Sequence, residues 1–558
     1  MKQLRYQRRK TQPVVVGNVT IGGDAPVVVQ SMANVSTNDI AAATKQAQAL
    51  VAADCKLIRY TTQGLREVRS VAKIKEELRA QGCNVPLVAD VHFSPQVAYE
   101  AAKVVEKVRI NPGNFYDPAR KFHLLSYSDA QYQQEVHELQ QQFAHFLEHC
   151  KANGAAIRIG VNHGSLSDRI MSRYGDTPAG MVESCMEFLR VCQQQAFHRV
   201  VISIKASNPL IMITTCRLLC QQMEAENMQY PLHLGVTEAG DGEDGRVKSA
   251  VGIGTLLAEG IGDTIRVSLS EDPTAEIPVA QTILQTIEQI KNAPQVQAPT
   301  TPPCASQPLL PGYSIPIVVA ELPHGETANF GPDTTPDWLN PNPNTLYEVT
   351  DESILNGTEI TPEIVGNRTL VVDLTHPNVP LVAQQIAHRV PVPFLLRLQC
   401  NKQGDQLAVA VSTLLGGALL EGYGAGLWLR SNLASPQELV QLSFRLLQAT
   451  RRRITRPDYI SCPGCGRTLF NLQETVATVK QATAHLKGLK IGVMGCIVNG
   501  PGEMADADYG YVGAAPGKID LYKGKVKVKK GIPQNKAVQE LVNLIKENGD
   551  WTEPQLEE

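Results

Sequence analysis

The 558-residue chain lacks a surplus of positive charge and has few aromatic residues. Lys and Arg number 52 against 55 Asp and Glu, and Phe, Trp and Tyr make up 5% of the chain. Proteins that hold nucleic acid through its phosphates usually carry a basic surface with interleaved aromatic side chains. The two shortages therefore argue against an RNA- or DNA-binding protein.

The chain also lacks an apolar run long enough to span a bilayer. Its basic start, Met1-Lys2-Gln3-Leu4-Arg5, leads into polar residues and has no apolar signal-peptide core behind it. Twelve cysteines without a secretion signal are typical of a reducing compartment. We expect a cytoplasmic protein with no membrane partner, and 43% hydrophobic residues suffice for two to four domains.

Three cysteines and one carboxylate near the C-terminus form a candidate ligand set. Cys462-Pro-Gly-Cys465 is followed after a gap by Cys496 and then by Asn499-Gly-Pro-Gly-Glu503. Thiolates are soft ligands suited to iron-sulfur clusters or zinc, and a Cys-x-x-Cys turn directs two sulfurs at one centre. A carboxylate in the fourth position would leave one corner of the metal centre exchangeable. The motif favours a reactive iron-sulfur cluster.

A structural zinc site and a redox disulfide are the alternatives for these cysteines. No histidine follows His485 to complete a zinc site, and a dithiol at Cys462 and Cys465 would not need Cys496. Spacing alone leaves zinc open. The other nine cysteines are scattered, and Cys216 and Cys220, at i and i+4 in an apolar run, are interpreted as core residues.

Short β-branched runs alternate with longer helical stretches between residues 26 and 270. This alternation predicts an α/β fold with a closed (β/α)8 TIM barrel, in which the chemistry lies at the C-terminal ends of the strands. The eight predicted strands are Pro26–Met32, Leu57–Thr62, Pro86–Val91, Lys107–Gly113, Ala156–Asn162, Arg199–Ser207, Pro231–Gly240 and Asp263–Ser270.

Cations and amides recur at these strand ends. Residues two or four apart on a strand share a face, so Arg109 with Asn111, and Arg158 with Asn162, are expected to point together into the barrel mouth. Guanidinium groups match phosphate oxygens in bidentate fashion. The pattern predicts an anion bound by the five cations Arg59, Arg109, Arg158, Lys205 and Arg266, beside which stand Asn111, Asn162 and Ser268.

Titratable residues stand at the same rim. Asp90 and His92 follow the third predicted strand, and Thr237 and Glu238 belong to the seventh. Glu238 is the preferred general acid or base and His92 the reserve. A structural role for His92, and an ion pair for Glu238, remain the alternatives.

Five segments in order resemble the 4-hydroxy-3-methylbut-2-enyl diphosphate synthase family of the non-mevalonate isoprenoid pathway. The resemblance covers about residues 8 to 290 and 455 to 545. It rests on Val88-Ala-Asp-Val-His-Phe93, Arg109-Ile-Asn-Pro-Gly-Asn114, Arg158-Ile-Gly-Val-Asn162, Gly235-Val-Thr-Glu-Ala-Gly240 and Gly495-Cys-Ile-Val-Asn-Gly-Pro-Gly-Glu503.

The resemblance implies an iron-sulfur oxidoreductase. It would open 2-C-methyl-D-erythritol 2,4-cyclodiphosphate reductively, with loss of water, using electrons delivered through a 4Fe-4S cluster by ferredoxin or flavodoxin. The implied cluster ligands are Cys462, Cys465, Cys496 and Glu503, with Glu503 exchangeable and Asn499 close to the reacting centre. The implied substrate ligands are the strand-end residues above together with Thr237. A zinc-stabilised barrel enzyme acting on another phosphorylated substrate is the alternative.

Residues 291–454 have no counterpart in two-domain members of this family and resemble the extra domain of three-domain members. We expect a TIM-barrel domain at 1–290, an insert at 291–454 that begins with a Pro-rich linker, and a cluster domain at 455–558. The resemblance implies that the cluster domain is α/β and like half of a sulfite or nitrite reductase.

The insert looks like a degenerate copy of the barrel. The segment Leu256–Gly262 is echoed by Leu415–Gly424, and aligning Glu259 with Glu421 places Trp428 where Arg266 stands. Its expected role is structural: a folded spacer would let a single chain close its own cluster on its own barrel, whereas two-domain members use a homodimer. A regulatory or partner-docking role is the alternative.

Overall fold

The computed structural model describes residues 3–91, 94–116, 126–297, 308–323, 325, 327–331, 334–497, 500–504 and 506–554, except for the side chains of Gln3, Gln297, Pro501 and Glu503. The chain divides into two compact units. The barrel unit holds residues 9–241, 262–280 and 457–558, and the insert unit holds residues 1–8, 242–261 and 281–456. Within the described residues, no helix is long and apolar enough to cross a membrane.

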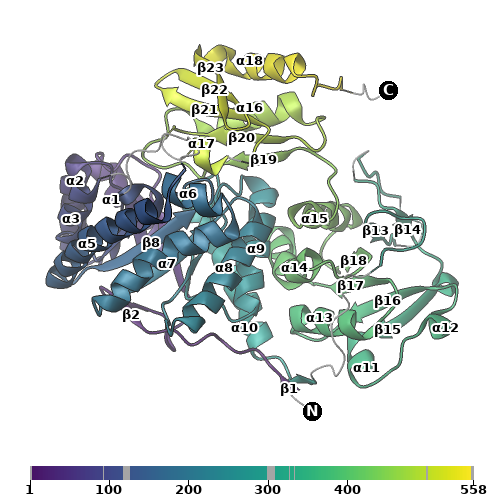
Figure 1. Cartoon of the computed structure of the whole chain (residues 1–558). Helices are drawn as coiled ribbons and strands as arrows, with labels where there is room; N and C mark the ends of the chain where they lie inside the picture. Colours follow the sequence, from purple (N-terminus) through teal and green to yellow (C-terminus); the bar gives the residue numbers. More distant parts are fainter. Residues whose placement is uncertain are drawn as a thin grey trace. The chain divides into compact units, whose positions relative to one another are not determined.

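Eight parallel strands form the barrel (Figure 1). The first strand pairs with the last, and a bridge between Ile202 and Leu232 joins the two remaining edges, so the sheet closes on itself. Each strand lies inside its predicted run, which confirms the predicted TIM barrel. The strands are β4 (Val28–Met32), β5 (Leu57–Thr61), β6 (Leu87–Asp90), β7 (Lys107–Ile110), β8 (Ala156–Asn162), β9 (Val200–Lys205), β10 (His233–Leu234) and β11 (Thr264–Ile265).

The helices between these strands begin at recognisable sequence signals. The Thr177 side chain accepts the Gly180 N–H at 3.1 Å, and Asn208 accepts the Leu210 N–H at 3.0 Å, each directly before a proline in the first turn. The helices of the barrel unit's first segment are α1 (Ile40–Ala52), α2 (Leu65–Ala80), α3 (Pro95–Ala102), α4 (Pro112–Phe115), α5 (Asp129–Asn153), α6 (Asp168–Tyr174), α7 (Pro178–Gln194) and α8 (Pro209–Ala225).

A hairpin closes the bottom of the barrel. Its strands are β2 (Val14–Val16) and β3 (Val19–Ile21), and Val14, Val16 and Ile21 pack against the residues that begin the barrel strands, such as Val28 and Leu57. Within the described residues, the hairpin thus covers the end of the barrel opposite the C-terminal ends of the strands.

The C-terminal part of the barrel unit is a five-stranded mixed sheet in the order β19-β20-β21-β22-β23. The first three strands run parallel, so their C-terminal ends share one edge, and the last two are antiparallel. The likeness to a sulfite or nitrite reductase stays a prediction. The elements are β19 (Asp458–Ser461), β20 (Lys490–Met494), β21 (Tyr509–Ala515), β22 (Lys518–Lys523), β23 (Val526–Pro533), α16 (Leu472–Thr483), α17 (Gly500–Glu503) and α18 (Gln534–Glu547).

The insert unit contains a six-stranded parallel sheet in the order β14-β13-β18-β17-β16-β15. Its first strand pairs with its last, as in the barrel, which agrees with the predicted barrel-like α/β domain. In the described residues the sheet stays open between β14 and β15. Its strands are β13 (Ile317–Ala320), β14 (Trp338–Leu339), β15 (Leu346–Thr350), β16 (Thr369–Leu374), β17 (Phe394–Gln399) and β18 (Gly426–Arg430).

Two glycine-rich helices pack closely inside the insert unit. They are α9 (Gly242–Ala258), which lies in the chain between two barrel strands, and α14 (Gly404–Leu420). A Cβ atom added at Gly254 would lie 2.9 Å from Thr413, and one at Gly416 would lie 3.0 Å from Val251. Helices α13 (Val379–Arg389) and α15 (Pro436–Ala449) complete the layer beside α14.

Candidate active site

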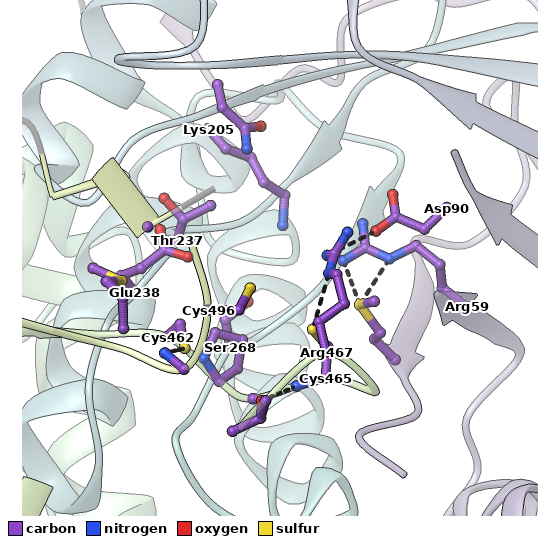
Figure 2. Close-up of a pocket in the computed structure, with 18 of the residues that line it drawn as sticks. Arg59, Asp90, Lys205, Thr237, Glu238, Ser268, Cys462, Cys465, Arg467 and Cys496 are labelled. Atoms are coloured by element: carbon purple, nitrogen blue, oxygen red, sulfur yellow. Dashed lines mark hydrogen bonds and ion pairs between the residues drawn. The ribbon is translucent and has the colours of Figure 1, made fainter. Parts of the chain in front are cut away.

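A pocket of about 690 Å³, including open solvent, lies in the barrel unit at the C-terminal ends of the barrel strands. Figure 2 shows that barrel residues and the cysteine-bearing segments both contribute to it. From the barrel the lining includes Met32, Arg59, Asp90, Arg109, Arg158, Asn162, Lys205, Thr237, Glu238, Arg266 and Ser268. From the C-terminal sheet it includes Cys462, Pro463, Gly464, Cys465, Arg467, Thr468, Met494, Gly495, Cys496 and Gly500.

Neighbouring strands place the predicted anion ligands side by side. Arg109 on β7 is in register with Arg158 on β8, and Asn162 at the end of β8 is in register with Lys205 at the end of β9. All four side chains are buried. Parallel register therefore brings together, as two pairs on neighbouring strands, polar side chains that the sequence scatters over about a hundred residues.

The pocket wall has more positive than negative side chains. Six cations line it against the two carboxylates of Asp90 and Glu238. Arg158 is 1% exposed, and its Nε and Nη1 atoms have no hydrogen-bond partner in the described structure. Arg59 donates to the Met32 sulfur at 2.8 Å, a weak acceptor. Buried donors left in this state favour the binding of an anion with several oxygens.

Burial and mutual repulsion destabilise the charged forms of these side chains. Burial, together with nearby arginines and only partly offset by Asp90, lowers the pKa of Arg59 to about 10. Burial and the neighbouring Arg266, Arg59 and Arg158 lower the pKa of Lys205 well below its usual value, although Glu238 acts in the opposite direction. A bound anion would remove this repulsion.

Two of the barrel strands' lining arginines already have carboxylate partners. Arg109 donates to Asp90 at 3.2 Å, and Arg266 donates to Glu276 at 3.1 Å. Glu276 also accepts from the Ser31 hydroxyl at 2.7 Å. These pairs fix the orientation of the guanidinium groups, so the cradle is formed before a ligand arrives.

The cysteines follow the ends of two parallel strands. Cys462 follows β19 and Cys496 lies two residues after β20. The Gly495 N–H donates to the Cys462 sulfur at 3.2 Å, and the Arg467 Nε donates to the Cys465 sulfur at 3.3 Å. The backbone oxygen of Cys462 accepts from the Ser270 hydroxyl at 2.8 Å, which ties this segment to the loop that follows the last barrel strand.

The donor set fits an iron-sulfur cluster. N–H donors directed at sulfur favour thiolates and are typical of the surroundings of such clusters. Loss of hydration raises the pKa of the Cys462 thiol, and a metal beside it would stabilise the thiolate. In the described residues no three Cys, His or carboxylate side chains converge as ligands of a single metal ion; the three cysteines are spread along the pocket wall.

Several predicted site residues lie elsewhere or outside the described parts. Asn111 is buried but does not line the pocket; its side chain accepts the Gly113 N–H at 3.2 Å and caps α4. His92 and Asn499 fall outside the described residues, as does the side chain of Glu503, the last residue of α17. Their predicted roles are therefore untested.

Three pocket features were missed from the sequence: Arg467, Met32 and the pairing of Arg266 with Glu276. For Arg467 a signal existed, because it stands two residues after Cys465, but nothing in the sequence shows that this loop faces the barrel. Met32, the last residue of β4, carries no charge that would mark it.

The lysine run near residue 525 is largely paired within the barrel unit. Lys525 lies 3.5 Å from Asp176, Lys527 lies 2.6 Å from Asp520, and Lys529 lies 2.9 Å from Glu540. A lysine run could dock an acidic electron carrier, but these ion pairs lower its net charge and so weaken that interpretation.

Comparisons with known proteins agree with the site. Residues 11–281 match the family described as GcpE TIM-barrel domain, and residues 458–547 match the GcpE protein C-terminal domain. A protein of Parabacteroides distasonis named 4-hydroxy-3-methylbut-2-en-1-yl diphosphate synthase (flavodoxin) is 48% identical, with 99% of this chain and 100% of that protein covered. A protein of the same name from Porphyromonas gingivalis is 47% identical, with coverage of 98% and 99%.

Solved structures add only a distant likeness. A dihydropteroate synthase of Yersinia pestis has a TM-score of 0.33 at 14% identity, with 50% of this chain and 99% of that protein covered.

Proposed function

Because the chain belongs to the 4-hydroxy-3-methylbut-2-en-1-yl diphosphate synthase family, we propose that it reductively opens 2-C-methyl-D-erythritol 2,4-cyclodiphosphate. Two electrons and one proton enter, the ring C–O bond to phosphate and the neighbouring C–OH bond break, and a C=C bond forms. Water and the linear allylic diphosphate leave. The observation that carries this proposal is the single pocket shared by strand-end cations and three cysteines.

The barrel residues would bind and orient the diphosphate. Arg158 and Arg59 bring donors that the protein itself leaves without strong acceptors, while Lys205 supplies a third positive charge. Cations fixed before binding place the reacting C–O bond without further reorganisation. We assign Arg109, Asn111, Asn162, Thr237, Arg266 and Ser268 to the same cradle. Asn111 also caps α4 through its side-chain oxygen.

The cysteine side of the pocket would hold the cofactor. We propose that Cys462, Cys465 and Cys496, with Glu503 as the exchangeable ligand, bind a 4Fe-4S cluster. When bound, that group supplies single electrons and an iron site for a substrate oxygen. The N–H groups of Gly495 and Arg467 would stabilise the thiolates.

The oxygen that leaves as water needs a proton, which we assign to Glu238. This residue is 4% exposed, lines the pocket and has a positive φ of 50°, an unusual backbone conformation that directs it differently from its strand neighbours. His92 remains the reserve and Asn499 a further candidate at the reacting centre.

We propose flavodoxin, with ferredoxin as the alternative, as the electron donor, in line with the names of the relatives. We also propose that one chain closes its own cluster on its own barrel with the insert as spacer, rather than acting as a homodimer. The shared pocket inside the barrel unit supports that arrangement. The domains proposed are 1–290, 291–454 and 455–558.

Visible and electron-paramagnetic-resonance spectra of the anaerobically purified protein test the proposal. We expect a brown protein whose cluster is reduced by dithionite and whose reduced signal changes when the cyclic diphosphate is added. Turnover with reduced flavodoxin should yield the linear diphosphate. Cys496→Ser is expected to abolish turnover, because it removes a thiolate ligand. A colourless protein that holds zinc after anaerobic reconstitution would contradict the proposal and favour the zinc-stabilised alternative.

A further inference from the structure

Arg467 is a sixth cation of the pocket, and it comes from the cysteine loop rather than from the barrel. Its side chain is 7% exposed. Figure 2 shows it between Asp90, at the end of β6, and Cys465. The Nε atom donates to the Cys465 sulfur at 3.3 Å, and Nη2 lies 3.7 Å from an Asp90 carboxylate oxygen. The residue thus touches both halves of the site.

The guanidinium of Arg467 is incompletely satisfied. Its Nη1 atom is buried and has no hydrogen-bond partner in the described structure. Its ion pair with Asp90 is longer than a direct hydrogen bond, and Asp90 is shared with Arg109, whose Nη1 lies 3.2 Å away. One carboxylate therefore serves two guanidinium groups. A further acceptor is expected, since buried donors without partners are disfavoured.

The loop that carries Arg467 is fixed against the barrel. The Cys465 N–H donates to the Thr468 hydroxyl at 3.0 Å, and the Leu469 N–H donates to the Gly495 oxygen at 3.1 Å. A Cβ atom at Gly466 would lie 2.9 Å from the Val35 backbone oxygen. Arg467 therefore has little freedom to leave the pocket except by rotation of its own side chain.

We propose that Arg467 is a further ligand of the diphosphate, exchanging its contact with Asp90 for a phosphate oxygen, and that it thereby couples substrate binding to the cysteine loop. The inference rests on the proposed function, which supplies the diphosphate. A guanidinium matches two phosphate oxygens at once, whereas its present partners are a distant carboxylate and a sulfur. Because the Arg467 Nε continues to donate to the Cys465 sulfur, a phosphate bound by the other nitrogens would change the electrostatic environment of that sulfur.

Binding to the oxidised holoprotein tests the proposal, with the cyclic diphosphate and inorganic pyrophosphate as separate probes. We expect Arg467→Gln to weaken binding of both by about 10- to 100-fold. Arg467→Lys should weaken it less, because lysine keeps the positive charge but lacks the paired N–H donors of a guanidinium. The matched control is Lys480→Gln. Lys480 joins the C-terminal sheet to Asp241 of the same unit outside the pocket, and this variant should bind within about twofold of wild type.

A second measurement separates ligation from a merely structural role. The reduction potential and reduced-state spectrum of wild type should shift when pyrophosphate is added, and the shift should be lost in Arg467→Gln but kept in Lys480→Gln. Equal affinities and equal shifts in wild type and Arg467→Gln would overturn the inference. If Arg467→Gln fails to retain iron, Arg467→Lys is titrated with pyrophosphate instead. Wild-type affinity in that variant would contradict a contact of two guanidinium nitrogens with the phosphate oxygens.

The two proposals fail in different ways. If wild type binds pyrophosphate through Arg467 but neither binds nor turns over the cyclic diphosphate, the proposed function is wrong and the anion site stands. If wild type turns over the cyclic diphosphate and Arg467→Gln binds it as tightly, the proposed function stands and the Arg467 inference is wrong.

Discussion

In the barrel and in the insert sheet the strands follow one another in chain order and the first pairs with the last, but the buried arginines of the two sheets have different partners. In the barrel, Arg158 is buried with two nitrogens unpartnered. In the insert, Arg397 on β17 pairs with Asp373 and with Glu348 at 2.6 Å, and its guanidinium lies 4.7 Å from the centre of the Trp428 ring. A parallel α/β scaffold is therefore not sufficient for a phosphate site; cations without internal partners are also needed.

The pKa values of Arg158 and Arg397 are shifted in opposite directions. Burial, with Arg59 and Arg109 nearby, lowers the pKa of Arg158. Burial also acts to lower the pKa of Arg397, but hydrogen bonds to Asp373 and Glu348 outweigh it and raise that pKa. The charged form of Arg158 is thus destabilised until an anion binds, whereas the charged form of Arg397 is already stabilised by its carboxylate partners.

The largest expected effect is the contrast between Arg158→Met and Arg397→Met in turnover. We expect Arg158→Met to lower kcat/KM by about 100- to 1000-fold, because it removes a fixed cation from the anion cradle. Arg397→Met should change kcat/KM by less than about threefold, since the insert holds no reacting group in the proposed function. Steady-state assays with reduced flavodoxin measure both. Comparable losses in the two variants would assign the insert a part in the chemistry.

The paired helices of the insert unit offer the next contrast. The alignment of Glu259 with Glu421 relates each residue of α9 to the residue 162 positions later in α14. Gly254 contacts Thr413, and its aligned partner Gly416 contacts Val251, which is itself aligned with Thr413. Reciprocal contacts of this kind are typical of a two-fold interface between copies. The two segments that resemble each other in sequence therefore also pack against each other through aligned residues.

Gly416→Leu is expected to destabilise the insert unit by about 2–3 kcal/mol, because the new side chain meets Val251 of α9. Gln406→Leu, on an exposed position of the same helix, should change stability by less than about 0.5 kcal/mol. Denaturant unfolding with hydrogen exchange in α9 and α14 measures both. Equal stabilities would show that the two helices do not need their close approach.

The strands could be predicted from sequence more reliably than the polar partners. Buried parallel strands are continuous β-branched runs, so each of the eight barrel strands fell within its predicted run. The pairing of Arg397 could not be predicted, because its carboxylates come from two other strands through register. The cap of α4 by Asn111 could have been predicted, because Asn-Pro-Gly is a helix-start signal, whereas the assignment of Asn111 to the substrate stays a prediction.

Stability should change in opposite directions when the same two arginines are replaced. Arg158→Met is expected to raise the free energy of unfolding of the ligand-free protein by about 1–2 kcal/mol, because it removes buried donors without partners. Arg397→Met should lower it by about 1–2 kcal/mol, since two carboxylates lose their cation. Denaturant unfolding at neutral pH checks the signs. A destabilised Arg158→Met would mean that the barrel arginine contributes to the fold as well as to binding.

The smallest expected effect is on the pH dependence of binding. Burial and neighbouring cations lower the pKa of Lys205 from the usual 10.5, so its ammonium loses a proton in the ligand-free protein at a lower pH than a free lysine does. In that window the unfolded chain binds more protons, so stability rises with pH while affinity for the diphosphate falls. The ligand's own charge is constant there, because each of its phosphates has one strongly acidic group.

Titration calorimetry at a series of pH values below 10.5 should show affinity for the cyclic diphosphate falling by about three- to tenfold as the pH rises through the lowered pKa of Lys205. Lys205→Arg should flatten this dependence, since a guanidinium keeps its charge more readily. Lys480→Arg, outside the pocket, should leave the slope unchanged. An unchanged dependence of affinity on pH in Lys205→Arg would mean that a different group on the pocket wall titrates. Glu238 would then be the next residue to replace.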